Sequence, residues 1–402
     1  MSKKDKTKIE KVAEPEEPLD IPEDEIWTYQ IPGLQAPHIG KSYSNFGLKK
    51  AIFIVTIIIA ILLSMYFSIR AVQKDTFEYS DLGNGTYEFV KFSNTGSITE
   101  LSVDYVSDIT YDENNAEADK SFTITKDESK PISVIHEYAF NCDEKLKVIK
   151  IGANVMQIDG KSFYTCNALE QIIVDENNQN YCDIDGVLYT KDKTQIICYP
   201  INHDQYLREK YGYEEELWPD NENYTQQYKQ DIQTYVLPST VETIGKLCFN
   251  YSNLVDVYLP EGVRTIETLG FFRCTSLENI YSYKTDEVIE NTHFENEDIF
   301  TQVYLSLPEG LKYIGSDAFS YNQAMTYVYI PSSISYVGHH AFWETAYKDD
   351  GNVCGVNEIN VALDEHTFTS QAHRGDQWRP QFDNGLFRKS VSVNYEAARA
   401  EK

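Results

Sequence analysis

Two cysteines of the sequence stand where a covalent cross-link could form. Cys182 immediately precedes the stretch DIDGVLYTKDKTQIICYP (183–200), and Cys198 lies near its end. The stretch has the pattern of a β-hairpin with a polar turn at its centre, and the two cysteines flank this hairpin. The ends of a hairpin lie close together, so these thiols could pair as a disulfide outside the cell. No Cys-x-x-Cys pair occurs, so the cysteines do not indicate a structural zinc site.

Other patterns for metal binding or catalysis are weak. Asp175, Asp183 and Asp185 resemble part of a calcium loop, but their spacing does not match an EF-hand, and the hairpin explains them better. The neighbours His339 and His340 are more typical of solvated histidines than of a chelating pair. The sequence has no nucleophile elbow, zinc-protease motif or phosphate-binding glycine loop. We therefore predict no catalytic residue, no bound metal and no cofactor.

Tyrosine gives the most informative pattern, since the 402 residues include 30 tyrosines. When β-strand segments are aligned on the prolines that end them, tyrosines fall at positions that point out of the predicted fold. The predicted surface residues are Tyr258, Tyr281, Tyr304, Tyr327 and Tyr329, edged by Asp256 and Glu278. Exposed aromatic side chains aligned across strands could bind a glycan or a peptide. The simpler interpretation is that tyrosine suits β-strands.

The strands that would position these tyrosines belong to a repeat. Phenylalanines recur every 23 residues, in the pairs Phe140 and Phe163, Phe249 and Phe272, and Phe319 and Phe342. Within single repeats, the alternation of a strand directs one set of side chains inward: Leu254, Val257 and Leu259, or Met325, Val328 and Ile330. Each repeat would bury these residues against the next one. Pro260 and Pro308 are 48 residues apart, about two periods, which predicts a degenerate repeat near 284–304.

The best copies read IGKLCFNYSNLVDVYLPEGV (244–263) and IGSDAFSYNQAMTYVYIPSSI (314–334). Over about residues 132–364, the chain resembles the BspA-type (treponemal-type) leucine-rich repeat family. The resemblance implies a mainly β leucine-rich-repeat solenoid of ~23-residue coils with short helical turns on its convex side. It also implies a surface-exposed protein that acts in adhesion or protein interaction.

The predicted repeat domain covers residues 131–365, with an excursion near 178–230 that contains the hairpin and a polar, Tyr-rich stretch. Residues 71–130 are predicted to form a juxtamembrane β element that caps the first repeat, because a repeat array exposes an open edge at each end. Residues 366–402 should form the other cap and a tail, with Trp378 and Phe387 packed on the last repeat.

A membrane segment is predicted before the repeats. Residues 51–69 read AIFIVTIIIAILLSMYFSI, 19 residues without a charge. As a helix they would span roughly 28 Å, close to the hydrocarbon thickness of a bilayer. A cleaved signal peptide is the alternative, but 50 residues precede the apolar run. We predict a signal-anchor helix at 49–70 that spans the membrane once.

The basic residues near the helix favour a cytoplasmic N-terminus, and residues 1–48 have the charged, Pro-containing composition of a disordered segment. The repeats would then lie outside the cell. The net charge of -28 disfavours nucleic acid as a partner. The predicted function is recognition or adhesion at the cell surface, with an extracellular protein or glycan as ligand. The alternative is a transmembrane sensor or envelope scaffold. An enzyme would need an active site in the polar stretch 202–230, where no catalytic set is evident.

Overall fold

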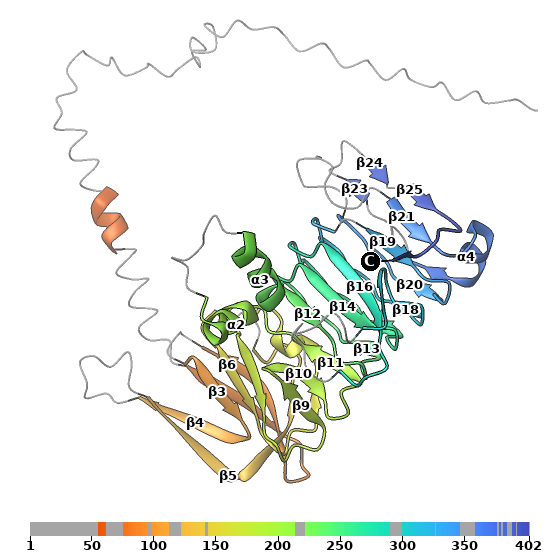
Figure 1. Cartoon of the computed structure of the whole chain (residues 1–402). Coiled ribbons are helices and arrows are strands. Elements are labelled where there is room, and N and C mark those ends of the chain that lie inside the picture. Colours follow the sequence, from red (N-terminus) through yellow and green to blue (C-terminus); the bar gives the residue numbers. More distant parts are fainter. Residues whose placement is uncertain are drawn as a thin grey trace, which may run out of the picture. The chain divides into compact units, whose positions relative to one another are not determined.

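The computed structural model describes a defined part of the chain (Figure 1). The described residues are 55–61, 75–94, 98–111, 122–140, 144–213, 222–289, 300–325, 327–345, 358–375, 378, 381–383, 388–390 and 392–401. The chain divides into two compact units, Met1–Ile69 and Arg70–Lys402.

In the first unit, residues 55–61 are helical. The predicted segment 1–48 and most of the predicted anchor 49–70 lie outside the described residues. Among the residues that are described, no helix has the length and apolar character needed to cross a membrane.

The second unit begins with a five-stranded sheet, in which four strands lie in one row and β7 (Gln157–Ile158) pairs with one of them. The order of the row is β1 (Thr76–Asp81), β2 (Tyr87–Ser93), β5 (Phe122–Ile135) and β4 (Tyr105–Tyr111). Strand β2 pairs with the end of β5 in parallel, and β5 pairs in parallel with β7. The Phe89 ring of β2 stacks on Phe140, at 5.2 Å between centroids. The sheet therefore supplies the first aromatic ring of the repeat stack.

The first repeats follow directly. Strands β3 (Glu100–Val103), β6 (Val148–Ile151) and β8 (Gln171–Val174) form a parallel sheet. The 3-10 helix η2 (Gly160–Phe163) carries Phe163, whose ring stacks on Phe140 at 5.7 Å and 8° between planes. These strands bury Leu101, Ile149 and Ile172 in one core.

A β-meander then interrupts the repeats. Strands β9 (Tyr181–Ile184), β10 (Val187–Thr190) and β11 (Gln195–Cys198) pair in antiparallel order, so the predicted hairpin is confirmed. Both faces of β10 are buried, because Val187 and Tyr189 pack in the core of the later repeats and Leu188 in the core of the earlier ones. The meander thus joins two stretches of repeat core.

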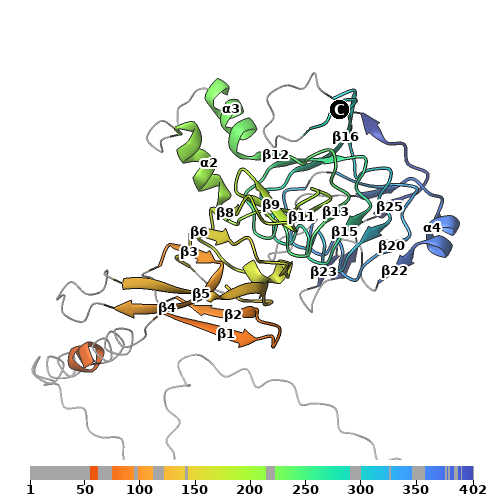
Figure 2. The same ribbon diagram turned by 90° about the horizontal axis from the view of Figure 1, so that it is seen from below.

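Two helices complete the excursion. Helix α2 (His203–Tyr211) ends at Gly212, whose φ of 72° gives the left-handed C-cap that glycine favours. Helix α3 (Glu222–Ile232) packs on α2 through Tyr228 and Ile232, which bury against Leu207. Figure 2 shows the two helices beside each other, next to β12.

The later repeats form two ladders. One contains β11, β13 (Thr243–Ile244), β15 (Thr265–Ile266), β18 (Tyr313–Ile314), β20 (Tyr336–Val337) and β22 (His373–Arg374), all in parallel. The other contains β12 (Thr234–Val236), β14 (Asp256–Pro260) and β16 (Asn279–Lys284), also in parallel. The predicted inward residues are confirmed, because all six of them are buried in one core: Leu254, Val257, Leu259, Met325, Val328 and Ile330.

The aromatic stack differs from the predicted spacing at one repeat. Phe271, not Phe272, stacks on Phe249, and Phe319 follows Phe271 at 5.2 Å. Phe271 is fully buried, whereas Phe272 is half-buried beside Tyr251. The predicted 23-residue interval between Phe249 and Phe272 is wrong. In the repeat motif a small residue precedes the stacked phenylalanine, and in this repeat that small residue is Gly270, so the stacked ring is Phe271.

The predicted degenerate repeat near 284–304 is also wrong. Strand β16 is followed by β17 (Gln302–Leu305), which runs antiparallel to it. On the other ladder, β15 pairs directly with β18, with no strand between them. The extra residues between β16 and β18 therefore let the chain turn back and pair β17 with β16 in one ladder. They add no strand to the other ladder and so do not form a further repeat.

The C-terminal part closes the repeats. Strands β19 (Val328–Ile330), β21 (Glu358–Val361) and β25 (Ser392–Asn394) form a separate parallel sheet. Helix α4 (Glu365–Gln371) is capped by the Asp364 carboxylate. Trp378 is buried against Phe368, whereas Phe387 lies outside the described residues. Strands β23 (Gln381–Asp383) and β24 (Arg388–Ser390) form a hairpin. The last strand, β26 (Ala400–Glu401), pairs with β17.

Candidate binding surface

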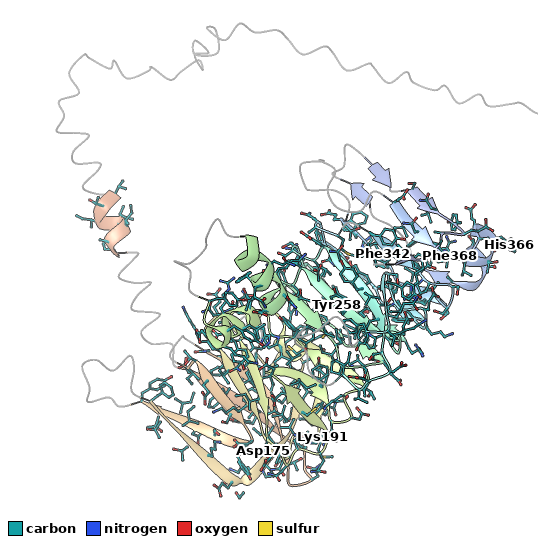
Figure 3. The ribbon with its side chains drawn as sticks, viewed as in Figure 1. Asp175, Lys191, Tyr258, Phe342, His366 and Phe368 are labelled. Carbon is teal, nitrogen blue, oxygen red and sulfur yellow. The ribbon has the colours of Figure 1, made fainter. Side chains whose placement is uncertain are left out.

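The structure brings two of the predicted tyrosines together on the outward face. Tyr258 of β14 and Tyr281 of β16 are in register, and their rings stack at 4.7 Å. Figure 3 shows Tyr258 on the later repeats. Phe300 stacks on its ring at 5.7 Å, and only 3% of Tyr258 is exposed. Tyr258 is predicted to be exposed, but the rings of Tyr281 and Phe300 pack on it and it is buried.

These rings belong to an aromatic cluster that is separate from the repeat core. We call it the outer aromatic cluster. Its buried members are Val236, Tyr258, Tyr283 and Ile289, and its partly buried members are Tyr281, Phe300 and Val303. The Tyr283 hydroxyl donates to the Leu237 carbonyl at 2.7 Å, which ties the cluster to the neighbouring repeat. Tyr283 and Phe300 carry no signal in the repeat pattern, so the sequence does not single them out as members of this cluster.

Tyr304 does not join this cluster. Strand β17 is antiparallel to β16 and pairs Ser282 with Tyr304 and Tyr283 with Val303. Residues that pair directly share a face, so Val303 lies on the outward face and Tyr304 on the opposite one. The predicted single row of tyrosines is therefore wrong, because it assumed that every strand runs in the same direction.

Tyr327 and Tyr329 lie farther along the array. Tyr327 is half-buried, but Tyr329 of β19 is only 4% exposed. The Tyr329 hydroxyl donates to Glu309 Oε1 at 3.3 Å. Burial and the nearby Glu309 carboxylate raise the pKa of Tyr329 to about 12.

The two predicted acidic residues are held by helix α3. Lys229 Nζ lies 3.0 Å from Asp256 Oδ2 and 3.6 Å from Glu278 Oε2. Asn279 also donates to Asp256 Oδ1 at 2.8 Å. The excursion therefore supplies a cation that neutralises this edge of the strand face, and the repeat pattern gave no sign of it.

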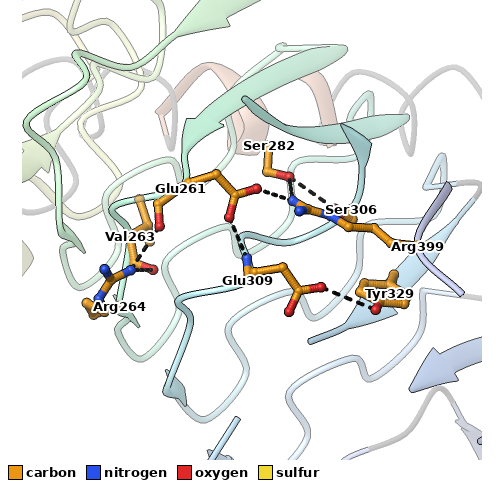
Figure 4. Close-up of polar contacts among 8 residues, drawn as sticks. All are labelled: Glu261, Val263, Arg264, Ser282, Ser306, Glu309, Tyr329 and Arg399. Atoms are coloured by element: carbon orange, nitrogen blue, oxygen red, sulfur yellow. Dashed lines mark hydrogen bonds and ion pairs between the residues drawn. The ribbon is translucent and has the colours of Figure 1, made fainter. Parts of the chain in front are cut away.

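A second site lies on the face that Tyr304 occupies, and we call it the arginine slot (Figure 4). It is formed by Glu261, Ser282, Tyr304 and Ser306, and it holds the side chain of Arg399. Arg399 Nε donates to Ser306 Oγ at 2.7 Å, and its terminal nitrogen contacts the Glu261 carboxylate and Ser282 Oγ. The guanidinium lies over the Tyr304 ring, 3.7 Å from the centroid. The Arg399 and Glu261 side chains are only 11% and 18% exposed.

The slot occupies a position that is apolar in the neighbouring repeat. Ser282 pairs with Leu259, and Leu259 is fully buried in the repeat core. Ser282 is equally buried, and its hydroxyl lies 3.0 Å from Ser306 Oγ. The backbone N–H of Glu309 donates to Glu261 Oε2 at 2.9 Å, which orients the carboxylate toward the guanidinium. Ser282 thus stands at the position of a core side chain, and together with the buried Ser306 it makes a polar lining that can accept hydrogen bonds from a guanidinium.

The predicted disulfide is not present, since Cys182 and Cys198 are both free thiols. Cys182 pairs with Tyr189 across β9 and β10, whereas Cys198 pairs with Leu188 across β10 and β11. Tyr189 and Leu188 point to opposite faces of β10, and the two thiols therefore do as well. Burial raises the pKa of both thiols.

The aspartates near the meander have structural hydrogen bonds. Asp183 Oδ1 accepts from the Val174 backbone N–H at 2.8 Å. Asp185 Oδ1 accepts from the Tyr206 hydroxyl at 2.7 Å, and Lys210 forms an ion pair with Asp185 at 2.8 Å. The two aspartates therefore connect the hairpin to β8 and α2.

A family model of the BspA type leucine rich repeat region matches residues 86–184 and 222–348, in six copies. These ranges cover more than half of the chain. The chain belongs to the BspA-type leucine-rich repeat family. The mainly β fold and the leucine-rich-repeat type inferred from the sequence are thereby confirmed.

Solved structures that are similar to the chain include bacterial leucine-rich repeat proteins. One from Eubacterium ventriosum is 16% identical, with 63% of this chain and 60% of that chain covered and a TM-score of 0.37. The pneumococcal vaccine antigen PcpA is 19% identical, with coverages of 68% and 61% and a TM-score of 0.37. The leucine-rich repeat protein of T. pallidum is 12% identical, with coverages of 76% and 99% and a TM-score of 0.29.

The chain thus spans about three fifths of the length of the first two of these proteins. No curated protein matches the chain.

Proposed function

We propose that this BspA-type protein recognises other proteins at the cell surface through the outward face of β14, β16 and β17. The observation that carries the proposal is the outer aromatic cluster, which packs on the strand face apart from the repeat core. Tyr281 and Phe300 remain half-exposed in it. Aromatic rings that are held rigidly and remain partly exposed are frequent centres of protein interfaces, because they bury a large area at low entropic cost.

Membership of a repeat family supports the same function. Stacked repeats present an extended surface whose outward residues are free to vary while the inward residues maintain the core. The two kinds of residue are separate here, since Val257 and Leu259 lie in the core whereas Tyr258, between them, lies in the outer aromatic cluster. The net charge of -28 further favours partners with basic surfaces.

Binding can be tested with the full chain in detergent against arrayed extracellular proteins and glycans. We expect at least one protein ligand, whose affinity falls about tenfold or more when Tyr281→Ser and Phe300→Ser are combined. The matched control combines Tyr138→Ser and Tyr211→Ser, two exposed tyrosines away from the cluster. Unchanged binding by the first double variant, at an unchanged melting temperature, would contradict the proposal. Binding to glycans alone would replace proteins as the ligand class.

Anchoring is a separate part of the proposal. The apolar run at 51–69 supports one membrane span, with residues 1–48 in the cytoplasm and the repeats extracellular as a solenoid. With a tag at each end, protease added to intact cells should remove the C-terminal tag and leave the N-terminal one. Loss of only the N-terminal tag would reverse the orientation, and survival of both tags would exclude surface exposure.

A further inference from the structure

The arginine slot lies where the regular stacking of the array is interrupted. One sheet of the later repeats ends with β17 and β26, and the next sheet begins at β19. Strand β26 is the edge of the first sheet, and only two of its residues pair with β17. A short segment of the chain therefore occupies a position where a longer strand could add to β17.

The chemistry of the slot lining suits a guanidinium. Its lining offers a carboxylate, two buried hydroxyls and an aromatic face to a single side chain, at Glu261, Ser282, Ser306 and Tyr304. A guanidinium is planar and carries several N–H donors, so it can bond to the oxygens and stack on the ring at once, which an ammonium cannot do. Buried hydroxyl and carboxylate groups cost free energy unless they are hydrogen-bonded, so a polar lining at a core position indicates a site that binds a guanidinium.

The segment that fills the slot is poorly matched to it apart from Arg399. The residues around Arg399 read YEAARAEK (395–402), which includes two glutamates, Glu396 and Glu401. The slot contains the Glu261 carboxylate, and Glu309 lies next to it. Like charges weaken binding, so a segment with arginine and without these acids would bind more tightly. The net charge of the chain also favours a cationic partner.

We propose that the arginine slot recognises an extended, arginine-bearing segment of a partner protein, and that β26 is an intramolecular substitute which the segment displaces. The inference rests on the proposed function, because it specifies the partner of a protein-binding protein. The partner segment would pair with β17 as an added strand and place its arginine over Tyr304. Competition with β26 would lower the apparent affinity, because only the fraction of molecules with an open slot can bind.

The test uses the full chain in detergent and two short labelled peptides. In one peptide, a single arginine stands among alternating threonine and valine; in the other, citrulline replaces it with the same shape and no charge. We expect Arg399→Ala to bind the arginine peptide about tenfold more tightly than the unaltered chain. The same variant should prefer arginine over citrulline by about tenfold, and adding Glu261→Gln should remove that preference.

A second measurement covers the case in which Arg399→Ala does not fold. With the unaltered chain, saturating arginine peptide should speed hydrogen exchange in residues 395–401, and citrulline peptide should not. Equal affinity for the arginine and citrulline peptides would overturn the proposal. So would an affinity for the arginine peptide that does not rise in Arg399→Ala, if hydrogen exchange in residues 395–401 of the unaltered chain is also unchanged by the peptide. Loss of a dimer in Arg399→Ala, seen by light scattering, would instead assign the slot to a second copy of the chain. If the Tyr281 and Phe300 variant loses its ligand while neither peptide binds, only this inference fails.

Discussion

The ring of Phe249 lies parallel to that of Phe271, with 4.7 Å between centroids and 5° between planes. Phe319 and Phe342 continue the stack at 5.1 Å. Each ring is fully buried and contributes to the core of two adjacent repeats. The stack is therefore the element through which one repeat depends on the next.

The stack predicts unequal effects for two neighbouring phenylalanines. Phe271→Ala should lower the free energy of unfolding by about 3–5 kcal/mol, because it removes a buried ring and leaves a cavity. Phe272→Ala should cost about 1 kcal/mol or less, since this ring is half-buried. Urea denaturation of the two variants and the unaltered chain measures both losses of unfolding free energy. Equal costs would contradict the assignment of Phe271 to the stack.

A glycine of the repeat motif should resist substitution. A Cβ atom at Gly338 would overlap the backbone of Gly315 and Ser316 in the preceding repeat. Gly338→Ala should therefore destabilise the fold by about 1–3 kcal/mol, as overpacking does. The control is Gly262→Ala, where the nearest atom to a new Cβ is the Val241 carbonyl oxygen at 3.5 Å, an ordinary contact. Thermal unfolding of both variants should separate them, and a normal melting temperature for Gly338→Ala would disprove the close contact.

The ion pair in the arginine slot should be energetically coupled. Glu261 and Arg399 are each largely buried, so loss of either partner leaves a poorly solvated charge. A double-mutant cycle with Glu261→Gln and Arg399→Gln should give a coupling energy of about 1–3 kcal/mol. The matched cycle uses Lys150 and Glu100, an exposed pair, and should give under about 1 kcal/mol. Additive effects in the first cycle would show that the two side chains do not interact.

Alkaline pH should destabilise the region around β19. The Tyr329 hydroxyl has its pKa raised from 10 to about 12, so the folded protein retains this proton when the unfolded chain loses it. The stabilisation is complete below pH 10 and is lost as the pH rises toward about 12. In Tyr329→Phe, the loss of stability over this pH range should be smaller than in the unaltered chain. Identical pH profiles would mean that Tyr329 titrates alike in both states.

Much of the repeat fold could be predicted from local patterns. Alternation identified Val257, Leu259, Val328 and Ile330 as core residues, and each is buried. Turn chemistry identified the hairpin of β10 and β11. These features depend on neighbours in sequence, and the physical rules for strands and turns act over the same short range.

The candidate sites depended on longer-range contacts. Lys229 neutralises Asp256 from a helix outside the repeats, and Arg399 reaches Glu261 across 138 positions of sequence. The serines of the slot are inconspicuous in the sequence, because only the register of β14 and β16 places Ser282 beside Leu259. A repeat alignment assigns each residue a place within its own repeat and cannot say what covers it.

The sequence by itself determined the repeat period, the inward residues and the apolar run at 51–69, since composition and periodicity specify them directly, and its repeat motif resembles that of the BspA-type family. Only the tertiary structure decided the direction of β17, the burial of Tyr258 and the position of Arg399. The direction of a strand such as β17 depends on which strand edge the chain can pair with after its loop. The burial of a side chain such as Tyr258 depends on which other side chains pack on its face of the sheet. Both are settled by contacts between segments far apart in the chain.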